Sequence, residues 1–409
     1  YYNTQHPSKS MPAGKIDSAA HLDFAPAFRY NTYCNNLTEE CMAVFIHCAD
    51  FHIDSPFSKE RAARRAEKRA ALVSSFIDMT EYIKREGVRL CLICGDLFDC
   101  PEPSEGAFQT VLSAMRDTPS CSFFISPGNH DPYIPGGIWD STMPENVRVF
   151  KSAEPQSVEM PEEGVRICGF ACLASTSPAD PTAHTVLPDD TLLNIIMGHA
   201  NTEGSEDGVY TLRTADLAQT ASDYIALGHI HASRGGRTAH GEYFYPGCVC
   251  GRDFGECGKK GVYLVTAEKG TVKKELLPSR APVYYNERLD ITDCSDFTDI
   301  SDAIAKLISG RGIEKDDCLR LTLCGAVNSD MHIETELLAA LCGTNAEITD
   351  LTTPTKDIAA LERAPGLRGE FVRTLMPQLG SDDADIRETA EEALRLGLAA
   401  IDGRKIDEI

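Results

Sequence analysis

The chain has 409 residues, 42% of them hydrophobic, and its 39 Lys and Arg against 62 Asp and Glu give a net charge of −23. This length exceeds one typical domain, so we expect two or three folded units with a large buried core. No apolar run is long enough to cross a bilayer, and no basic-then-apolar signal peptide is visible, which excludes a membrane-spanning protein and predicts a cytoplasmic one.

Five short apolar runs, beginning near residues 42, 89, 121, 192 and 223, each lead into a polar motif. Runs of this length bounded by Gly, Pro and Asp are typical of buried strands. Polar side chains at the carboxyl ends of such strands meet in one crevice beside the sheet. The motifs, in chain order, are Asp50-Phe-His52, Gly95-Asp96-Leu-Phe-Asp99, Gly128-Asn129-His130-Asp131, Gly198-His199 and Gly228-His229-Ile-His231.

The donor atoms of these motifs indicate a metal site. Two carboxylates, one amide oxygen and four imidazoles suit Mn, Fe or Zn better than Ca, and suit Mn better than Mg. Two cations roughly 3.5–4 Å apart would clamp the attacking and leaving oxygens of an in-line displacement and lower the pKa of a shared water. We therefore predict two divalent metal ions, Mn in first place with Fe, Zn or Mg as alternatives, and hydrolysis of a phosphoester.

The ordered motifs resemble those of the calcineurin-like metallophosphoesterases over residues 42–277, and within them the SbcD-type and YhaO-type DNA repair exonucleases. The resemblance implies an α/β fold, a four-layer metallophosphoesterase β-sandwich flanked by helices. It also implies the roles of the metal ligands. One metal would be bound by Asp50, His52 and His231, the other by Asn129, His199 and His229, with Asp96 bridging the two.

His130 matches the family's catalytic histidine. It follows the ligand Asn129 without being needed for coordination, so it can face the scissile phosphate and donate a proton to the leaving 3′ oxygen or a hydrogen bond to the phosphorane. We expect Asp131 or another carboxylate to orient it. Asp99 would lie beside the bridging carboxylate, as in the family. Each of these two aspartates has an alternative role, because a carboxylate after a turn often caps the next helix.

The segment from Tyr245-Pro-Gly247 to residue 264 resembles the turn and glycine-rich hairpin of the exonuclease branch. The resemblance would place Arg252 near the site as a substrate-binding residue, with a surface salt bridge as the alternative. Cysteines at 248, 250 and 257 stand where that branch has small or acidic residues. No second Cys pair lies at zinc-ribbon spacing, so a zinc site is not favoured. We interpret the sixteen cysteines as buried thiols in a reducing compartment, not as disulfides.

A basic segment over residues 59–69 follows the first motif and is expected to be helical. It would line a groove for a nucleic-acid strand, or it is only the solvated face opposite an apolar stripe. The net charge of −23 opposes binding of a polyanion, although salt screens that repulsion beyond about a Debye length.

The chain divides into four predicted parts. Residues 1–41 precede the point where the resembled family begins, so we expect a non-native or poorly ordered extension, or else an arm that wraps the core. Residues 42–285 form the nuclease domain. Residues 286–352 show two strand-like runs with helices near 301–308 and 333–341, which we interpret as a small α/β capping domain. Residues 353–409 form a helical tail with apolar faces near 367–376 and 386–401.

Three functions fit these patterns. The first is a Mn-dependent DNA exonuclease or endonuclease of DNA repair, whose tail docks on an SMC-like coiled-coil ATPase, as the resemblance implies, and which also forms a homodimer. The second is a phosphodiesterase or pyrophosphatase for nucleotides or other small molecules, which the acidic balance tolerates better. The third is an interaction protein that uses the fold as a scaffold, and the intact ligand set argues against it.

Overall fold

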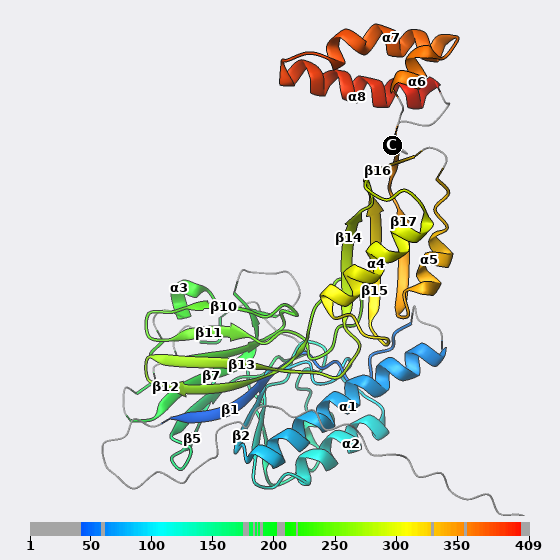
Figure 1. Cartoon of the computed structure of the whole chain (residues 1–409). Coiled ribbons are helices and arrows are strands. Elements are labelled where there is room, and N and C mark those ends of the chain that lie inside the picture. The colour runs from blue at the N-terminus through cyan, green and yellow to red at the C-terminus, as the bar shows by residue number, and fades with distance from the viewer. Residues whose placement is uncertain are drawn as a thin grey trace, which may run out of the picture.

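The computed structural model describes residues 42–58, 62–174, 180–182, 185, 187–188, 191–202, 209–217, 220–328, 331–355 and 358–401. The predicted extension over residues 1–41 lies outside this part of the chain. Three units follow one another in Figure 1: a large core with two sheets, a small α/β unit, and a group of three helices.

The first core sheet has the strand order β13-β12-β1-β2-β3-β4. Strands β1 to β4 run parallel to one another, whereas β12 is antiparallel to β1 and β13 is antiparallel to β12. Parallel strands place their carboxyl ends at one edge, which is where the first three polar motifs begin. The strands are β1 (Ala43–Cys48), β2 (Leu90–Ile93), β3 (Ser122–Ile125), β4 (Val147–Val149), β12 (Gly261–Glu268) and β13 (Thr271–Pro278).

The second core sheet has the order β10-β11-β9-β7-β6-β5, with β8 paired to β7. Its central strands β6, β7, β9 and β11 are parallel, so β7, which carries the fourth motif, and β9, which precedes the fifth, run toward the same edge. The strands are β5 (Gln156–Met160), β6 (Val165–Gly169), β7 (Leu193–Asn201), β8 (Tyr210–Thr211), β9 (Tyr224–Gly228), β10 (Arg234–Arg237) and β11 (Glu242–Tyr245).

Helices and sheets stack in four layers. Helices α1 (Ala62–Glu86) and α2 (Glu105–Arg116) cover the outer face of the first sheet through apolar stripes that include Phe76 and Met115. Phe45 of β1 and Ile195 of β7 pack in the core between the two sheets. The short helix α3 (Thr214–Leu217) packs Leu217 in the cluster on the other face of the second sheet. The predicted α/β sandwich flanked by helices is confirmed.

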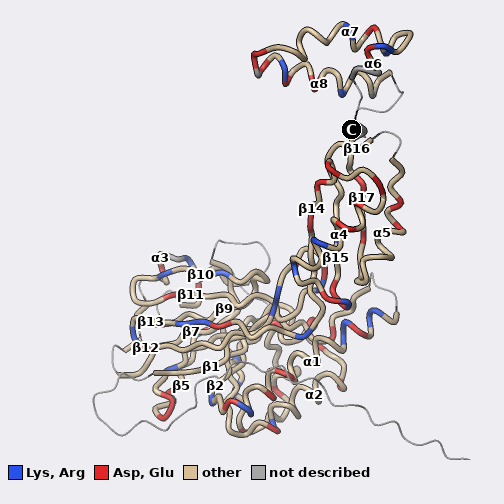
Figure 2. The backbone as a smooth tube through the Cα atoms, viewed as in Figure 1, with Lys and Arg blue, Asp and Glu red and all other residues tan. Residues whose placement is uncertain are grey.

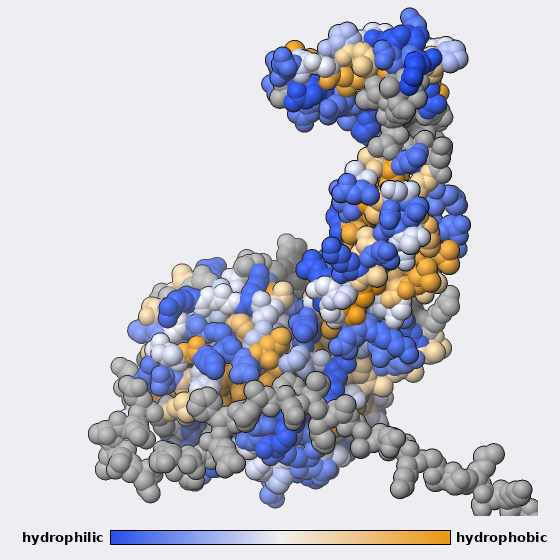
Figure 3. Space-filling view, viewed as in Figure 1, coloured by the Kyte–Doolittle hydropathy of each residue, from blue (hydrophilic) through white to orange (hydrophobic). Residues whose placement is uncertain are grey.

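The small α/β unit follows the core directly. Its parallel sheet β14-β15-β17 carries α4 and α5, and Ile300 and Ile304 of α4 pack in its core. The unit extends a few residues beyond the predicted bounds at both ends. Figure 3 shows hydrophobic side chains on its surface. Its elements are β14 (Tyr284–Asp290), α4 (Phe297–Arg311), β15 (Cys318–Cys324), β16 (Ala326–Asn328), α5 (Thr335–Leu341), β17 (Asn345–Asp350) and β18 (Thr353–Thr355).

The last unit is a group of three helices, α6 (Ile358–Arg363), α7 (Leu367–Leu379) and α8 (Ala384–Ile401). The two helical patterns of the sequence correspond to α7 and α8, which pack around Val372, Leu394 and Leu398. Leu367 and Ile386 remain 73% and 46% exposed. In the part of the chain that is described, no helix is both long enough and apolar enough to cross a membrane.

Candidate metal centre

The predicted ligands gather at the edge where β1, β2, β3 and β9 end. Asp50, Asp96 and Asn129 lie in the segments that directly follow β1, β2 and β3. His229 follows β9, but Gly198 and His199 lie inside β7, which continues to Asn201. The expectation that every motif follows the end of its strand is therefore wrong for His199, which reaches the others from within the sheet.

The backbone is left-handed at four of the predicted ligands. The φ angles are 53° at Asp50, 49° at His52, 50° at Asp96 and 103° at His229. Such conformations cost about 1–3 kcal/mol per residue and persist only where the surroundings enforce them. Here two backbone hydrogen bonds join the loops, from Asp50 N to the Gly95 oxygen (3.0 Å) and from His52 N to the Asp96 oxygen (2.9 Å). The strained backbone conformations therefore occur at residues that are predicted to bind metal.

Asp50, His52 and His231 form the first group of donor atoms, in which one ligand atom of each lies within 4.8 Å of the others. The Nδ1 atom of His52 is 2.8 Å from Asp99 Oδ1, and that of His231 is 2.6 Å from Glu256 Oε1. Each Nδ1 therefore carries the proton and each Nε2 keeps its lone pair. The two Nε2 atoms face each other at 3.1 Å, an arrangement that a cation between them would stabilise.

Asp96, Asn129 and His199 form the second group. Nδ1 of His199 donates to the Cys94 carbonyl oxygen at 2.9 Å, which leaves the lone pair on Nε2. That Nε2 lies 2.9 Å from Asn129 Oδ1 and 3.4 Å from Asp96 Oδ2. The ring centroid of His229 is 5.3 Å from that of His199. Acceptor atoms without a proton between them again fit a cation.

Asp96 lies between the two groups. Its Oδ2 atom is 3.4 Å from His199 Nε2 and 3.7 Å from His52 Nε2, while Oδ1 accepts a hydrogen bond from the His130 backbone N–H at 2.9 Å. Burial would raise the pKa of Asp96, but the neighbouring imidazoles of His199 and His52 and the hydrogen bond from the His130 backbone lower it overall. This position and charge suit a carboxylate shared by two ions.

His130 lies at the rim with 43% of its side chain exposed. Its Nδ1 is 3.2 Å from the Asp99 backbone oxygen and 3.7 Å from Asp99 Oδ1, and its ring is edge-on to that of His52. The carboxylate beside His130 is therefore that of Asp99. Asp131, the partner considered first in the sequence, is fully buried and accepts hydrogen bonds from the backbone N–H groups of residues 96, 98 and 128. Its carboxylate therefore links the loop after β2 to the loop after β3.

Arg252 is close to the site but is already paired. Its Nη1 is 3.3 Å from Asp99 Oδ1, its Nη2 is 3.0 Å from Glu256 Oε1, and 22% of its side chain is exposed. Glu256 was not predicted as a site residue, although it lies in the segment 245–264 that resembles the family's hairpin, because it does not directly follow a strand. Burial would raise the pKa of Glu256, but its hydrogen bonds to His231 and Arg252 hold that pKa well below its usual range.

The basic residues at the start of α1 contact neighbouring loops. Lys68 Nζ donates to the Arg252 oxygen at 3.1 Å, Arg69 Nε donates to the Ser55 oxygen at 2.9 Å, and Arg64 Nη2 lies 2.8 Å from Cys318 Sγ in β15. These three side chains are half-buried and bonded to other segments of the chain, so they form neither a fully solvated face nor a free basic groove. Residues 59–61 of the predicted basic helix lie outside the described residues.

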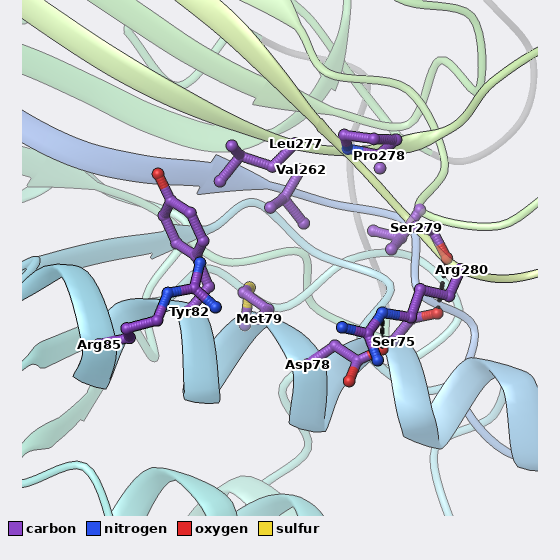
Figure 4. Close-up of a pocket in the computed structure, with 12 residues that line it drawn as sticks. Ser75, Asp78, Met79, Tyr82, Arg85, Val262, Leu277, Pro278, Ser279 and Arg280 are labelled. Atoms are coloured by element: carbon purple, nitrogen blue, oxygen red, sulfur yellow. Dashed lines mark hydrogen bonds and ion pairs between the residues drawn. The ribbon is translucent and has the colours of Figure 1, made fainter. Parts of the chain in front are cut away.

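A pocket lies away from the metal donors, between α1 and the β12–β13 hairpin (Figure 4). Its lining includes Asp78, Tyr82 and Arg280. Of the described residues that line it, none belongs to the polar motifs. This pocket is therefore separate from the strand-end cluster.

Two stacked α/β sheets with buried carboxylates and imidazoles at their strand ends define the metallophosphoesterase class. Residues 43–233 match the family model for calcineurin-like phosphoesterases. The uncharacterized metallophosphoesterase YhaO of Bacillus subtilis is 32% identical over 299 residues, which cover 69% of this chain and 71% of that protein. The chain belongs to the calcineurin-like phosphoesterase family.

The SbcD component of the nuclease SbcCD of Bacillus subtilis is 25% identical over 285 residues, which cover 58% of this chain and 70% of that protein. The component of the same name from Rhodobacter capsulatus is 34% identical over 91 residues, or 21% of each chain. The predicted resemblance to YhaO-type and SbcD-type proteins is confirmed. Family membership makes the chain a phosphoester hydrolase that uses divalent metal ions.

Proposed function

We propose that the chain is a two-metal, Mn-dependent phosphodiesterase that hydrolyses DNA as a repair exonuclease or endonuclease. The observation that carries the two-metal proposal is the position of Asp96 Oδ2, which lies 3.7 Å from His52 Nε2 of one donor group and 3.4 Å from His199 Nε2 of the other. Within the first group, the Nε2 atoms of His52 and His231 also face each other at 3.1 Å, and each ring has its Nδ1 bonded to a carboxylate.

Seven side chains would hold the metals. They are Asp50, His52 and His231 for one ion, Asn129, His199 and His229 for the other, and Asp96 for both. When bound, the ions supply Lewis acidity to a phosphoryl oxygen and lower the pKa of coordinated water. The donor set of hard oxygens and imidazole nitrogens fits Mn, with Fe, Zn and Mg as alternatives.

His130 would act on the leaving group. Its Nδ1 points to the Asp99 backbone oxygen at 3.2 Å, so Nε2 is the atom left to face a substrate at the exposed rim. A protonated Nε2 would donate to the leaving oxygen, and the Asp99 carboxylate, 3.7 Å from Nδ1, would stabilise the imidazolium. General acid catalysis of this kind contributes about 10²–10⁴-fold in rate.

The choice of DNA is supported by the relatives named as nuclease components. The net charge of −23 and the pairing of the basic side chains on α1 and of Arg252 favour the alternative, a phosphodiesterase for nucleotides or other small molecules. Figure 2 shows Lys and Arg along α1, near the small α/β unit. That end of α1 is where a strand would approach the centre.

The three-helix group would dock on a partner, for which an SMC-like coiled-coil ATPase is our proposal. The relatives named above are parts of a larger nuclease by name, and exposed Leu367 and Ile386 offer apolar contacts. We also propose that the chain forms a homodimer. Light scattering of the purified chain would test this.

Hydrolysis by the purified protein with Mn tests the function, with a 3′-labelled single strand, a duplex and bis-p-nitrophenyl phosphate compared side by side. His130→Ala should keep both metals and lose about 10²–10⁴-fold in rate. His240→Ala, which changes an exposed histidine in the β10–β11 turn, is the matched control and should retain full activity.

Loss of oligonucleotide cleavage in His130→Ala alone would support the nuclease. Cleavage of only the small diester would support the small-molecule phosphodiesterase. Full activity in His130→Ala would overturn the proton-donor role of that residue.

A further inference from the structure

Glu256 contacts His231, a predicted metal ligand, and both of its carboxylate oxygens already accept hydrogen bonds. Its Oε1 is 2.6 Å from His231 Nδ1. Its Oε2 accepts the Arg252 backbone N–H at 2.8 Å, and the Arg252 guanidinium is 3.0 Å from Oε1. The carboxylate is 13% exposed. Both of its oxygens are thus occupied by donors.

A third ion beside Glu256 is excluded by charge. One ligand atom each of His231, Cys248 and Glu256 lies within 4.8 Å of the other two, as in a metal site. However, Arg252 Nη2 lies 3.2 Å from His231 Nδ1 and 3.0 Å from Glu256 Oε1. The guanidinium already supplies the positive charge there, so a second cation would be repelled. Glu256 therefore acts through His231.

Each of the two imidazoles in the first donor group is held by a carboxylate at its Nδ1 atom. Asp99 holds His52 through Nδ1 at 2.8 Å, and Glu256 holds His231 through Nδ1 at 2.6 Å. Carboxylates in this position fix the tautomer and orientation of a metal-binding histidine and increase its basicity. The two carboxylates also share Arg252, which is 3.3 Å from Asp99 Oδ1. One arginine thereby joins both supports.

The loop that carries Glu256 is fixed to the small α/β unit. Phe254 is edge-on to Tyr284 of β14, with ring centroids 5.1 Å apart, and the Arg320 guanidinium of β15 lies 4.1 Å from the Phe254 ring centroid. The Gly258 backbone N–H donates to the Tyr284 oxygen at 2.9 Å. Within the loop, Glu256 N donates to the Asp253 oxygen at 3.0 Å. These contacts join the Glu256 loop to the small unit.

We infer that Glu256 is a positioning residue that holds His231 Nε2 toward its metal, and that the small α/β unit keeps Glu256 in place through Phe254. The inference rests on the proposed assignment of His231 as a metal ligand. It gives the small unit a role at the metal centre itself.

Manganese binding tests the role of Glu256 without a substrate. Isothermal titration calorimetry of Glu256→Ala should show one of two Mn²⁺ sites weakened by about 10–100-fold and the other unchanged. Electron paramagnetic resonance at equal Mn²⁺ loading should show less of the coupled two-ion signal. Glu256→Gln keeps an acceptor oxygen for His231 Nδ1 and should recover part of the affinity. Lys259→Gln removes a charge from an exposed position of the same loop and should bind like the unmodified chain.

Unchanged affinity in both Glu256 variants would overturn the positioning role. If Glu256→Ala does not fold, Glu256→Gln alone decides: a weakened single site supports the inference and equal affinity refutes it. Should the unmodified chain bind fewer than two Mn²⁺, the proposed metal assignment fails, which is a different result from a failure of Glu256.

The role of the small unit is tested through Phe254. Phe254→Ala removes both ring contacts and should weaken the same Mn²⁺ site by about tenfold, while Phe254→Leu keeps most of the volume and should lose less. Tyr285→Ala is the control, because Tyr285 belongs to β14 of the small unit and packs against that unit's own core. Equal affinity in Phe254→Ala would overturn the coupling between the small unit and the centre.

Discussion

The burial of His47 makes a quantitative prediction about acid stability. This histidine lies in β1 with 0% exposure, and its Nδ1 is 2.9 Å from the Tyr224 hydroxyl. Burial, together with the charge of Lys274, lowers the pKa of His47 from 6.5 to about 3. The folded protein therefore excludes a proton that the unfolded chain binds below pH 6.5.

The sign and size follow from proton linkage. Between pH 6.5 and 3 the unfolded state binds more protons at His47, so stability falls as the pH falls through this window. A pH of 5.0 lies about 1.5 units below the pKa of His47 in the unfolded chain. At about 1.4 kcal/mol per unit, the free energy of unfolding falls by about 2 kcal/mol. His47→Gln cannot titrate and can still hydrogen-bond to Tyr224, so it should not show this loss.

Urea unfolding at pH 7.5 and 5.0, in EDTA so that no metal contributes, measures the effect. The single tryptophan, Trp139, is buried in the core domain and reports its unfolding by fluorescence. The unmodified chain should lose about 2 kcal/mol more than His47→Gln between the two pH values. His240→Gln, at an exposed position, should behave like the unmodified chain. Equal losses in His47→Gln and the unmodified chain would refute the reasoning.

Three further outcomes are expected. Gly128→Ala would drive a Cβ into the Asp96 carboxylate at Oδ1, so calorimetry should show Mn²⁺ affinity at least about tenfold weaker, and normal affinity would contradict the packing. Because the metal binds only the folded state, Mn²⁺ at 100 times its Kd should stabilise the core by about 2.7 kcal/mol over the EDTA-treated protein, and an unchanged unfolding midpoint would argue against a structured centre. Leu398→Ala opens a cavity between α7 and α8 and should lower the free energy of unfolding of these helices by about 2–5 kcal/mol. In urea, helical circular dichroism should then be lost at a lower concentration, while hydrolysis of the small diester persists. A parallel loss of hydrolysis would show that the three helices support the core.

The motif positions could be placed from the sequence because the strand, the turn and the polar side chain are encoded within a few consecutive residues. Asp50, Asp96 and Asn129 follow their strands as expected, and local pattern was enough to find them. The partner of His130 was harder, because Asp131 is adjacent in sequence while Asp99 is adjacent in space. Neighbours along a turn point in different directions, which a sequence pattern does not resolve.

Glu256 could not be found in this way. It lies in a glycine-rich loop whose path is fixed by Phe254, Tyr284 and Arg320, and the last two belong to another unit. Its only local signal is the spacing of four residues from Arg252, with which it pairs. The contact with His231 joins residues 25 positions apart in the sequence, so no local pattern reveals it.

The left-handed backbone at Asp50, His52, Asp96 and His229 restricts the amino acids that these positions can accept. Asp, Asn and His are the non-glycine residues that adopt this conformation most readily, whereas β-branched residues are strongly disfavoured there. Glycine would relieve the backbone but supply no donor atom. Selection therefore acts on these sites through shape and chemistry together, and a drift in metal preference would have to proceed by exchanges among aspartate, asparagine and histidine.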